Sequence, residues 1–153
     1  MLSLASCSKL ARCEMDKVRA EVLDYDEQVR ELRPLQRRWK RHIEEFEGKI
    51  FTNQKAGVDL LRAVLVKETW EMHRQLKAVK VRSRLLRKPH DRRVAAVQSL
   101  ARAYEGLMKA YPKEDFAAIR KGLKAREEAM RRLARAELAI KRLIQKYRRG
   151  QRR

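Results

Sequence analysis

Phosphate binding is the chemistry that the residue types of this chain favour most. The stretch from Arg74 to Arg93 holds nine Lys or Arg residues and a single acid, Asp91. A solvated helix face normally mixes charges of both signs, so a run of one sign favours a polyanionic partner. The bases that we expect to contact phosphates here are Arg74, Lys77, Lys80, Arg82, Arg84, Arg87, Lys88, Arg92 and Arg93.

A second basic cluster lies at 141–153, which contains no acid. We expect this tail to be loose when free and to become ordered on a polyanion. Its predicted phosphate contacts are Lys141, Arg142, Lys146, Arg148, Arg149, Arg152 and Arg153.

The composition indicates what kind of polyanion would bind. Lys and Arg number 40 against 20 Asp and Glu, which gives a net charge of +20 in 153 residues. Such charge supplies affinity for nucleic-acid phosphates whatever the sequence, through counterion release. Aromatic residues make up only 6%, and Trp39, Trp70, Tyr104 and Phe116 are predicted to be core residues rather than base-stacking platforms. The combination favours recognition of folded RNA by shape and backbone.

Other chemistry finds no support in the sequence. There is no Gly-rich phosphate loop, no G-x-S-x-G and no His-rich helix face. Cys7 and Cys13, with three scattered histidines, lack a metal-ligand spacing and are interpreted as reduced, structurally neutral thiols. We therefore expect no catalytic residue, metal, cofactor or small-molecule substrate. No apolar run approaches the ~20 residues of a membrane span, so a membrane-spanning protein is not expected either.

The elements that would position these bases are helices. Five Gly and three Pro interrupt the chain, and sustained period-two alternation is absent, so the predicted class is all-α without a sheet. Apolar residues spaced by threes and fours at 58–86 and 94–111 predict an antiparallel hairpin over 58–111. Its joint is placed at 82–93, where Pro89 could begin the second helix. The expected contacts across the hairpin pair Leu65, Met72 and Leu76 with Leu100, Tyr104 and Leu107.

Helical extensions are expected on both sides of the hairpin. The region 14–57 is predicted to hold a long helix, because apolar residues follow a heptad from Met15 to Ile50. Pro34 should kink this helix near Arg30 to Pro34. Residues 48–57 are predicted to form a connection in which Thr52 or Asn53 caps the next helix. The region 112–153 is predicted to hold a long last helix followed by the basic tail.

The first thirteen residues, 1–13, contain Lys9, Arg12 and three serines but no acid. This composition is similar to that of a short mitochondrial targeting segment. Two interpretations stay open, namely a targeting segment and an ordinary N-terminus.

Two short motifs in the hairpin resemble large-subunit ribosomal protein twenty-nine. Its first-helix signature has a basic-acidic pair before an aromatic and a later Gln, matched here by Lys67-Glu68, Trp70 and Gln75. The mitochondrial branch has a V-L-L-K-E run, which 64–68 matches except at Val66. Its second-helix signature, S-[IM]-A-R, is similar to Ser99-Leu-Ala-Arg102. The resemblance implies a helical hairpin on ribosomal RNA near the peptide exit tunnel, without enzyme activity, and adds Arg102 to the RNA contacts.

The sequence thus predicts a long antiparallel helical hairpin with additional long N- and C-terminal helices, acting as a structural protein of the large ribosomal subunit. The extensions look like those of organellar ribosomal proteins, so the predicted location is the mitochondrial matrix, bound to the ribosome. The expected partners are ribosomal RNA and neighbouring large-subunit proteins. Two alternatives remain open: a helical accessory or assembly subunit of a mitochondrial membrane respiratory complex, and a coiled-coil scaffold without RNA.

Overall fold

A computed structural model describes the backbone of residues 4–149 and the side chains of residues 12–149. Within residues 4–149 no strand occurs, so the all-α class predicted from the sequence is confirmed. The elements are α1 (Leu4–Glu31), α2 (Arg33–Thr52), α3 (Gln54–Leu60), the π-helical turn η1 (Leu61–Leu65), α4 (Val66–Ala78), α5 (Arg84–Ala110), the 3-10 turn η2 (Tyr111–Lys113) and α6 (Phe116–Arg149).

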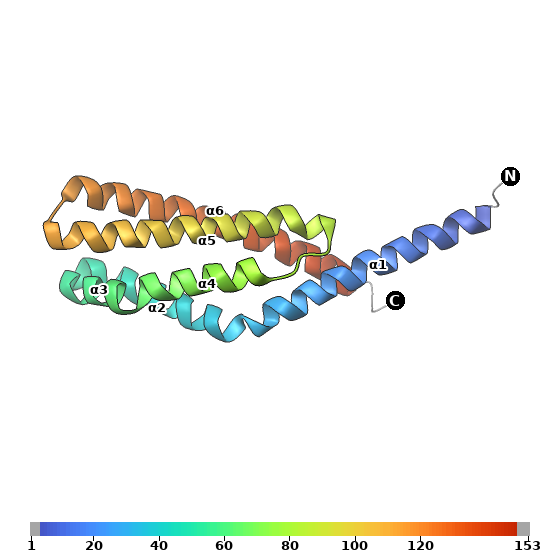
Figure 1. Cartoon of the computed structure of the whole chain (residues 1–153), viewed down its shortest axis with the longest axis horizontal. Helices are drawn as coiled ribbons and strands as arrows, with labels where there is room; N and C mark the ends of the chain where they lie inside the picture. Colours follow the sequence, from blue (N-terminus) through green and yellow to red (C-terminus); the bar gives the residue numbers. More distant parts are fainter. Residues whose placement is uncertain (1–3, 150–153) are drawn as a thin grey trace.

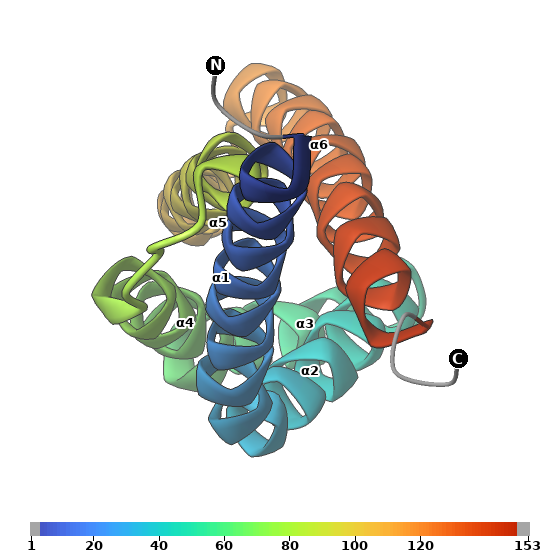
Figure 2. The same cartoon turned by 90° about the vertical axis from the view of Figure 1, so that its right-hand side faces the viewer.

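These elements form an antiparallel bundle of long helical rods. α1 and α2 form a bent rod, and α3, η1 and α4 continue one another as a second rod that runs in the opposite direction (Figure 1). α5 returns beside α4, and α6 runs back along almost the whole of α5. Seen end-on, the rods surround a shared interior (Figure 2), while the first part of α1 projects beyond the others (Figure 1). The hairpin segments therefore belong to a larger bundle.

The break between α1 and α2 lies where Pro34 predicts it. α1 ends at Glu31, Leu32 forms a turn, and Pro34 sits in the first turn of α2. A proline is tolerated there because the first N–H groups of a helix have no intrahelical partner. The predicted helix on both sides of a bend is confirmed.

The connection from α2 to α3 is much shorter than predicted. α2 continues through Gly48 to Thr52, and the break is confined to Asn53, whose side chain accepts a hydrogen bond from the N–H of Ala56 at 3.1 Å. This bond confirms Asn53 as the cap of the next helix. Gly57 permits the sharp reversal, since a Cβ there would lie 3.0 Å from the Cα of Ile50.

The joint between α4 and α5 lies earlier than the sequence predicts. α4 ends at Ala78, residues 79–83 are extended, and α5 begins at Arg84, so most of the predicted joint is helical. Gln28 of α1 fixes the extended segment, because its side chain accepts from the N–H of Lys80 at 2.9 Å and donates to the Lys80 carbonyl at 3.2 Å. The prediction that Pro89 begins the second helix is wrong, since Pro89 lies inside α5. Near a helix start it removes only one intrahelical bond.

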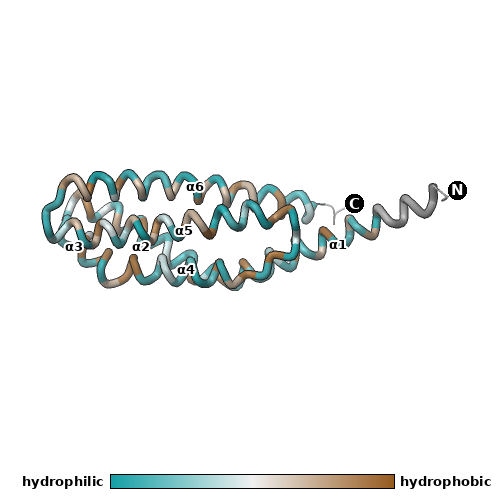
Figure 3. Tube along the Cα trace, turned by 45° about the horizontal axis from the view of Figure 1, so that its top comes forward, coloured by the Kyte–Doolittle hydropathy of each residue, from teal (hydrophilic) through white to brown (hydrophobic). Residues whose placement is uncertain are grey.

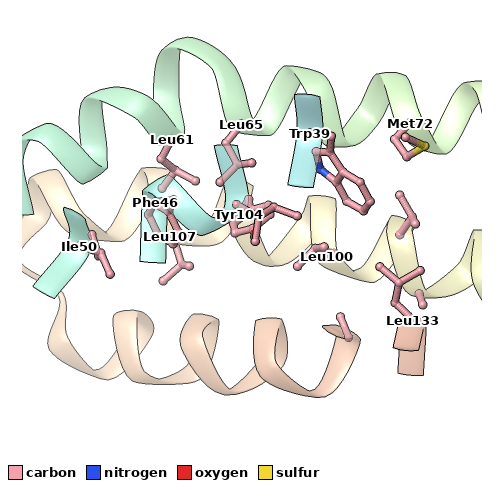
Figure 4. Close-up of a cluster of buried hydrophobic side chains, with 14 of the residues drawn as sticks. Trp39, Phe46, Ile50, Leu61, Leu65, Met72, Leu100, Tyr104, Leu107 and Leu133 are labelled. Atoms are coloured by element: carbon pink, nitrogen blue, oxygen red, sulfur yellow. The ribbon is translucent and has the colours of Figure 1, made fainter. Parts of the chain in front are cut away.

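The main hydrophobic core fills the bundle along α2, η1, α4, α5 and α6. Trp39 and Phe46 are buried there, and the six side chains expected to pair across the hairpin lie in the same cluster. Figure 4 shows side chains of α2, η1 and α5 pointing toward one another. Hydrophobic and hydrophilic residues alternate along each rod (Figure 3), as expected for helices that bury one face.

A second, smaller hydrophobic cluster lies at the other end of the bundle. Val22 and Tyr25 of α1 pack there with Leu86 of α5 and with Ile140 and Ile144 of α6. Leu86 therefore lies on the second helix of the hairpin and not on the first, where its spacing placed it. The cluster attaches α1 to α5 and α6.

Polar side chains separate the two clusters. Glu137 of α6 accepts hydrogen bonds from Gln36 at 3.0 Å and Lys40 at 3.2 Å, both on α2, and from Arg93 of α5 at 3.3 Å. Along α5 and α6, Arg93 and Glu137 each fall between residues of the second cluster and residues of the main core. This polar layer favours one register of α2, α5 and α6, because Gln36, Lys40 and Arg93 must all reach the single carboxylate of Glu137.

Several residues of the predicted apolar stripes are exposed. Met15, Phe116 and Leu138 lie on the surface, although the sequence predicts Met15 and Phe116 as contact or core residues. Met15 precedes Val18 and Val22, the first residues of α1 that pack in the second cluster, and Phe116 is the first residue of α6. The tail is helical as far as Arg149, which contradicts the expectation that it is loose from residue 141.

Candidate nucleic-acid interface

The first turns of α5 carry the densest group of exposed bases. Arg84, Lys88 and Arg92 follow one another at four-residue spacing, so they share one face of the helix, and Arg87 lies beside them. Asp91 is the only acid that lines the hollow around these four bases. Cations at the start of a helix oppose its macrodipole, so this arrangement weakens α5 unless an anion binds there.

A groove between α5 and α6 continues this basic group. Arg92 of α5 and Arg132 and Arg135 of α6 line it, over a floor of small residues that includes Ala136 and Ser99. Its volume is ≈ 470 Å³ and none of its lining residues is acidic. Because Arg92 lines both hollows, six bases form one continuous surface, here called the α5/α6 basic face: Arg84, Arg87, Lys88, Arg92, Arg132 and Arg135.

Arg132 and Arg135 were missed by the sequence analysis. They lie outside both one-sign runs, in a stretch where Glu127 and Glu128 mix the charges. Arg132 forms an intrahelical ion pair with Glu128, and its side chain is 61% exposed. The available signal was the spacing of Arg132, Arg135 and Ala139, which puts two bases and a small residue on one helix face.

Arg93 does not belong to this interface, and its assignment as a phosphate contact is wrong. It is 5% exposed and pairs with Glu137 in the polar layer. The physical reason is helical periodicity, because Arg93 lies on the same face as the buried residues Leu86, His90 and Val97.

The other predicted contacts are dispersed over the molecule. Lys77, Lys80, Arg82 and Arg102 are exposed around the α4–α5 connection and the outer side of α5. The predicted contacts on α6 are also exposed: Lys141, Arg142, Lys146, Arg148 and Arg149. Two predicted contacts have acidic partners within the protein: Arg74 pairs with Glu71, and Arg148 with the buried Asp26. Arg152 and Arg153 lie outside the described residues, as does the start of the targeting-like segment 1–13.

The residues that resemble the ribosomal signatures mostly bind within the protein. Glu68 accepts from Arg38 Nε at 2.7 Å, and its other oxygen lies 2.6 Å from His42 Nδ1, so it joins α4 to α2. The indole N–H of Trp70 donates to Glu105 at 2.8 Å and joins α4 to α5. Of the second signature, Ser99 and Arg102 are exposed and therefore accessible to a partner.

Buried titratable groups lie beside the interface. His90 accepts or donates a hydrogen bond at Nδ1 with the hydroxyl of Tyr25, at 3.0 Å. Burial lowers the pKa of His90, and the charge of Arg93 lowers it further. Burial also lowers the pKa of His73, with Lys77 and Arg102 acting in the same direction. Both imidazoles are therefore held neutral at neutral pH, inside a strongly basic region.

No metal-holding group of three or more His, Cys, Asp or Glu side chains is found in the described part of the chain. The described helices also include none that is both long and apolar enough to cross a membrane. What the surface offers chemically is a set of exposed guanidinium and ammonium groups around a shallow groove, which suits electrostatic binding of phosphates.

Neither a protein-family model, nor a curated protein, nor a solved structure matches this chain.

Proposed function

We propose that this chain binds the phosphate backbone of folded RNA through the α5/α6 basic face, as a structural protein of the large subunit of the mitochondrial ribosome. The observation that carries the proposal is the continuous basic surface, whose six bases have one acid, Asp91, among the residues that line it. The ribosomal and mitochondrial parts rest on the resemblance of 64–75 and 99–102 to the ribosomal family and on the composition of 1–13.

The mechanism is neutralisation of phosphates by side chains that the bundle holds in place. α5 and α6 are packed along most of their lengths, so bases from the two helices keep a fixed separation. Arg side chains can bind phosphate oxygens in a bidentate manner, whereas Lys88 acts as a point charge. The small residues on the groove floor let a backbone approach the helices closely.

A salt titration tests the proposal. Arg84, Arg87, Lys88 and Arg92 are all exposed, so replacing the four with Gln should leave the bundle folded. At low salt, this variant should bind a structured RNA more weakly than the unchanged chain does. The log–log salt slope should become shallower by about 3, since each lost phosphate contact removes roughly 0.7–0.9 of slope.

A matched variant controls for net charge. Lys109, Lys113, Arg120 and Lys121 are also exposed but lie near the α5–α6 turn, at the opposite end of α5. Changing these four to Gln removes the same charge and should affect the slope much less. Equal effects of the two variants would reject a specific basic face.

Cosedimentation tests the ribosomal assignment. A tagged full-length chain should sediment with mitochondrial large subunits, and the variant with four changes in α5 should do so less. Recovery of the chain in a respiratory complex would favour that alternative. Recovery with neither, together with an absence of RNA binding, would favour the coiled-coil scaffold.

A further inference from the structure

A second groove, between α4 and α5, has a different chemistry from the basic face. His73 and Lys77 of α4, Val79 of the connection, and Arg87, Val94 and Gln98 of α5 line what we call the α4/α5 groove. Its volume is ≈ 510 Å³. Val79 and Val94 line part of its wall beside the polar side chains of His73 and Gln98, so this groove can accommodate a flat group with polar edges.

Polar groups able to form hydrogen bonds point into this groove. His73 is 8% exposed, yet neither its imidazole nor the Gln98 amide forms a side-chain hydrogen bond with another described residue. A neutral imidazole offers one donor and one acceptor, and a primary amide offers both kinds. Neither side chain has a fully buried polar atom that lacks a partner, so these donors and acceptors are open to a ligand in the groove.

The ring of His73 is held in place by Trp70. The two rings meet edge to face, with centroids 5.5 Å apart and an interplanar angle of 86°. Trp70 is itself fixed by its hydrogen bond to Glu105 of α5. A side chain with so little freedom presents a preformed surface to a partner, which reduces the entropic cost of binding.

The groove adjoins the α5/α6 basic face. Arg87 and Asp91 line both the α4/α5 groove and the basic hollow at the start of α5. Lys77 lies on the other wall, and Arg102 is close enough to lower the pKa of His73. An RNA strand whose phosphates lie on the basic face could therefore place one adjacent nucleobase in the groove. Arg87 and Lys77 at the rim would then contact the phosphate of that nucleotide.

We propose that the α4/α5 groove binds a single unpaired nucleobase of the RNA, which contacts the His73 ring and hydrogen-bonds to His73 and Gln98. This inference rests on the proposed RNA-binding function and adds a specific subsite to it. Unpaired bases are the usual targets of specific RNA recognition, because their edges and faces are free to be contacted. Val79 and Val94 provide apolar contact for the ring of the base.

The test compares two RNAs that differ by one nucleotide. One is a short fully paired duplex, and the other is the same duplex with one unpaired adenine. The full chain should bind the second about 10-fold more tightly at the same salt concentration, which is the size of effect expected for contact with one base. Replacing the unpaired adenine by 2-aminopurine should give a fluorescence change when the protein binds.

Variants separate the groove from the basic face. Gln98→Ala and His73→Leu should each reduce the preference for the unpaired base and the fluorescence change, while binding to the paired duplex and its salt slope stay the same. Gln98 is only half-buried, so its variant should fold even if the loss of His73 destabilises the bundle. Ser99→Ala is the matched control, because Ser99 is the next residue but lines the α5/α6 groove.

The outcomes are distinct. Salt-dependent binding to both RNAs without a preference, or a preference that both variants retain, overturns the nucleobase subsite and leaves the proposed function intact. An absence of binding to either RNA overturns the proposed function and the subsite together.

Discussion

Two buried tyrosines should respond in opposite directions to the same substitution. Tyr25 and Tyr104 are both 0% exposed. The hydroxyl of Tyr25 is hydrogen-bonded to His90 Nδ1 at 3.0 Å, whereas the hydroxyl of Tyr104 has no partner among the described residues. Burial raises the pKa of both phenols, so both are neutral near pH 7. Changing each to Phe removes one oxygen and little else.

The magnitudes follow from the state of each hydroxyl. A buried polar group without a partner costs about 1–3 kcal/mol, so Tyr104→Phe should stabilise the protein by about 1 kcal/mol. The ring contact of Tyr104 with Phe46, at 5.7 Å between centroids, is retained in the variant. Tyr25→Phe removes a hydrogen bond and leaves His90 without it, which should destabilise the protein by about 1–2 kcal/mol.

Urea unfolding followed by circular dichroism measures both effects. With a slope of about 1–3 kcal/mol per molar urea, the midpoints of the two variants should lie on opposite sides of the wild-type midpoint. Each tyrosine variant serves as the control for the other, because the chemical change is identical. Equal destabilisation by the two substitutions would refute the reasoning and show that the Tyr104 hydroxyl has a partner, such as a bound water.

Further predictions concern pH and the glycines. Because the pKa of His90 is lowered in the folded protein, its contribution to stability is fully present above the unfolded value of about 6.5 and is lost as the pH falls through the folded value. The urea midpoint should therefore decrease as the pH is lowered from about 7 to about 5.5. His90→Gln should make this decrease smaller. Gly57→Ala should destabilise the protein, because the new Cβ would meet the backbone of Ile50 at 3.0 Å. Gly48→Ala has open space around it and should stabilise α2 by about 1 kcal/mol; thermal unfolding of the two variants checks the opposite signs.

The helical class and the break at Pro34 could be predicted because their causes are local. Helical spacing, scarce Gly and Pro, and the steric demands of proline act within a few residues of the chain. The N-cap at Asn53 is local in the same way, since its side chain bonds a backbone group three residues later.

The α4–α5 joint could not be predicted because distant residues determine it. Residues 79–83 contain neither Gly nor Pro, and they are extended because Gln28 binds the backbone of Lys80 from another rod. Pro89 gave a stronger local signal in the wrong place. The packing of α6 against α5 could not be predicted from the sequence either, because the apolar stripe of one helix does not identify which other helix will cover it.

The candidate site was predicted in part. The exposed bases at the start of α5 follow from the one-sign charge run, but Arg93 lies within the same run and is buried. Its partner Glu137 is 44 residues away in sequence, so charge counting alone could not separate it from its neighbours. Arg132 and Arg135 join the face only through the α5–α6 packing.

The division of the interior into two clusters has a consequence for cooperativity. α1 is linked to the bundle through the small cluster around Val22 and Tyr25 and through the polar contacts of Gln28 and Asp26, and a break at Leu32 separates it from α2. The main core, beyond the polar layer, draws its buried residues from elements other than α1. Opening of α1 therefore exposes few apolar side chains of its own, so this helix forms a low-energy foldon that can exchange its amide protons while the main core stays intact.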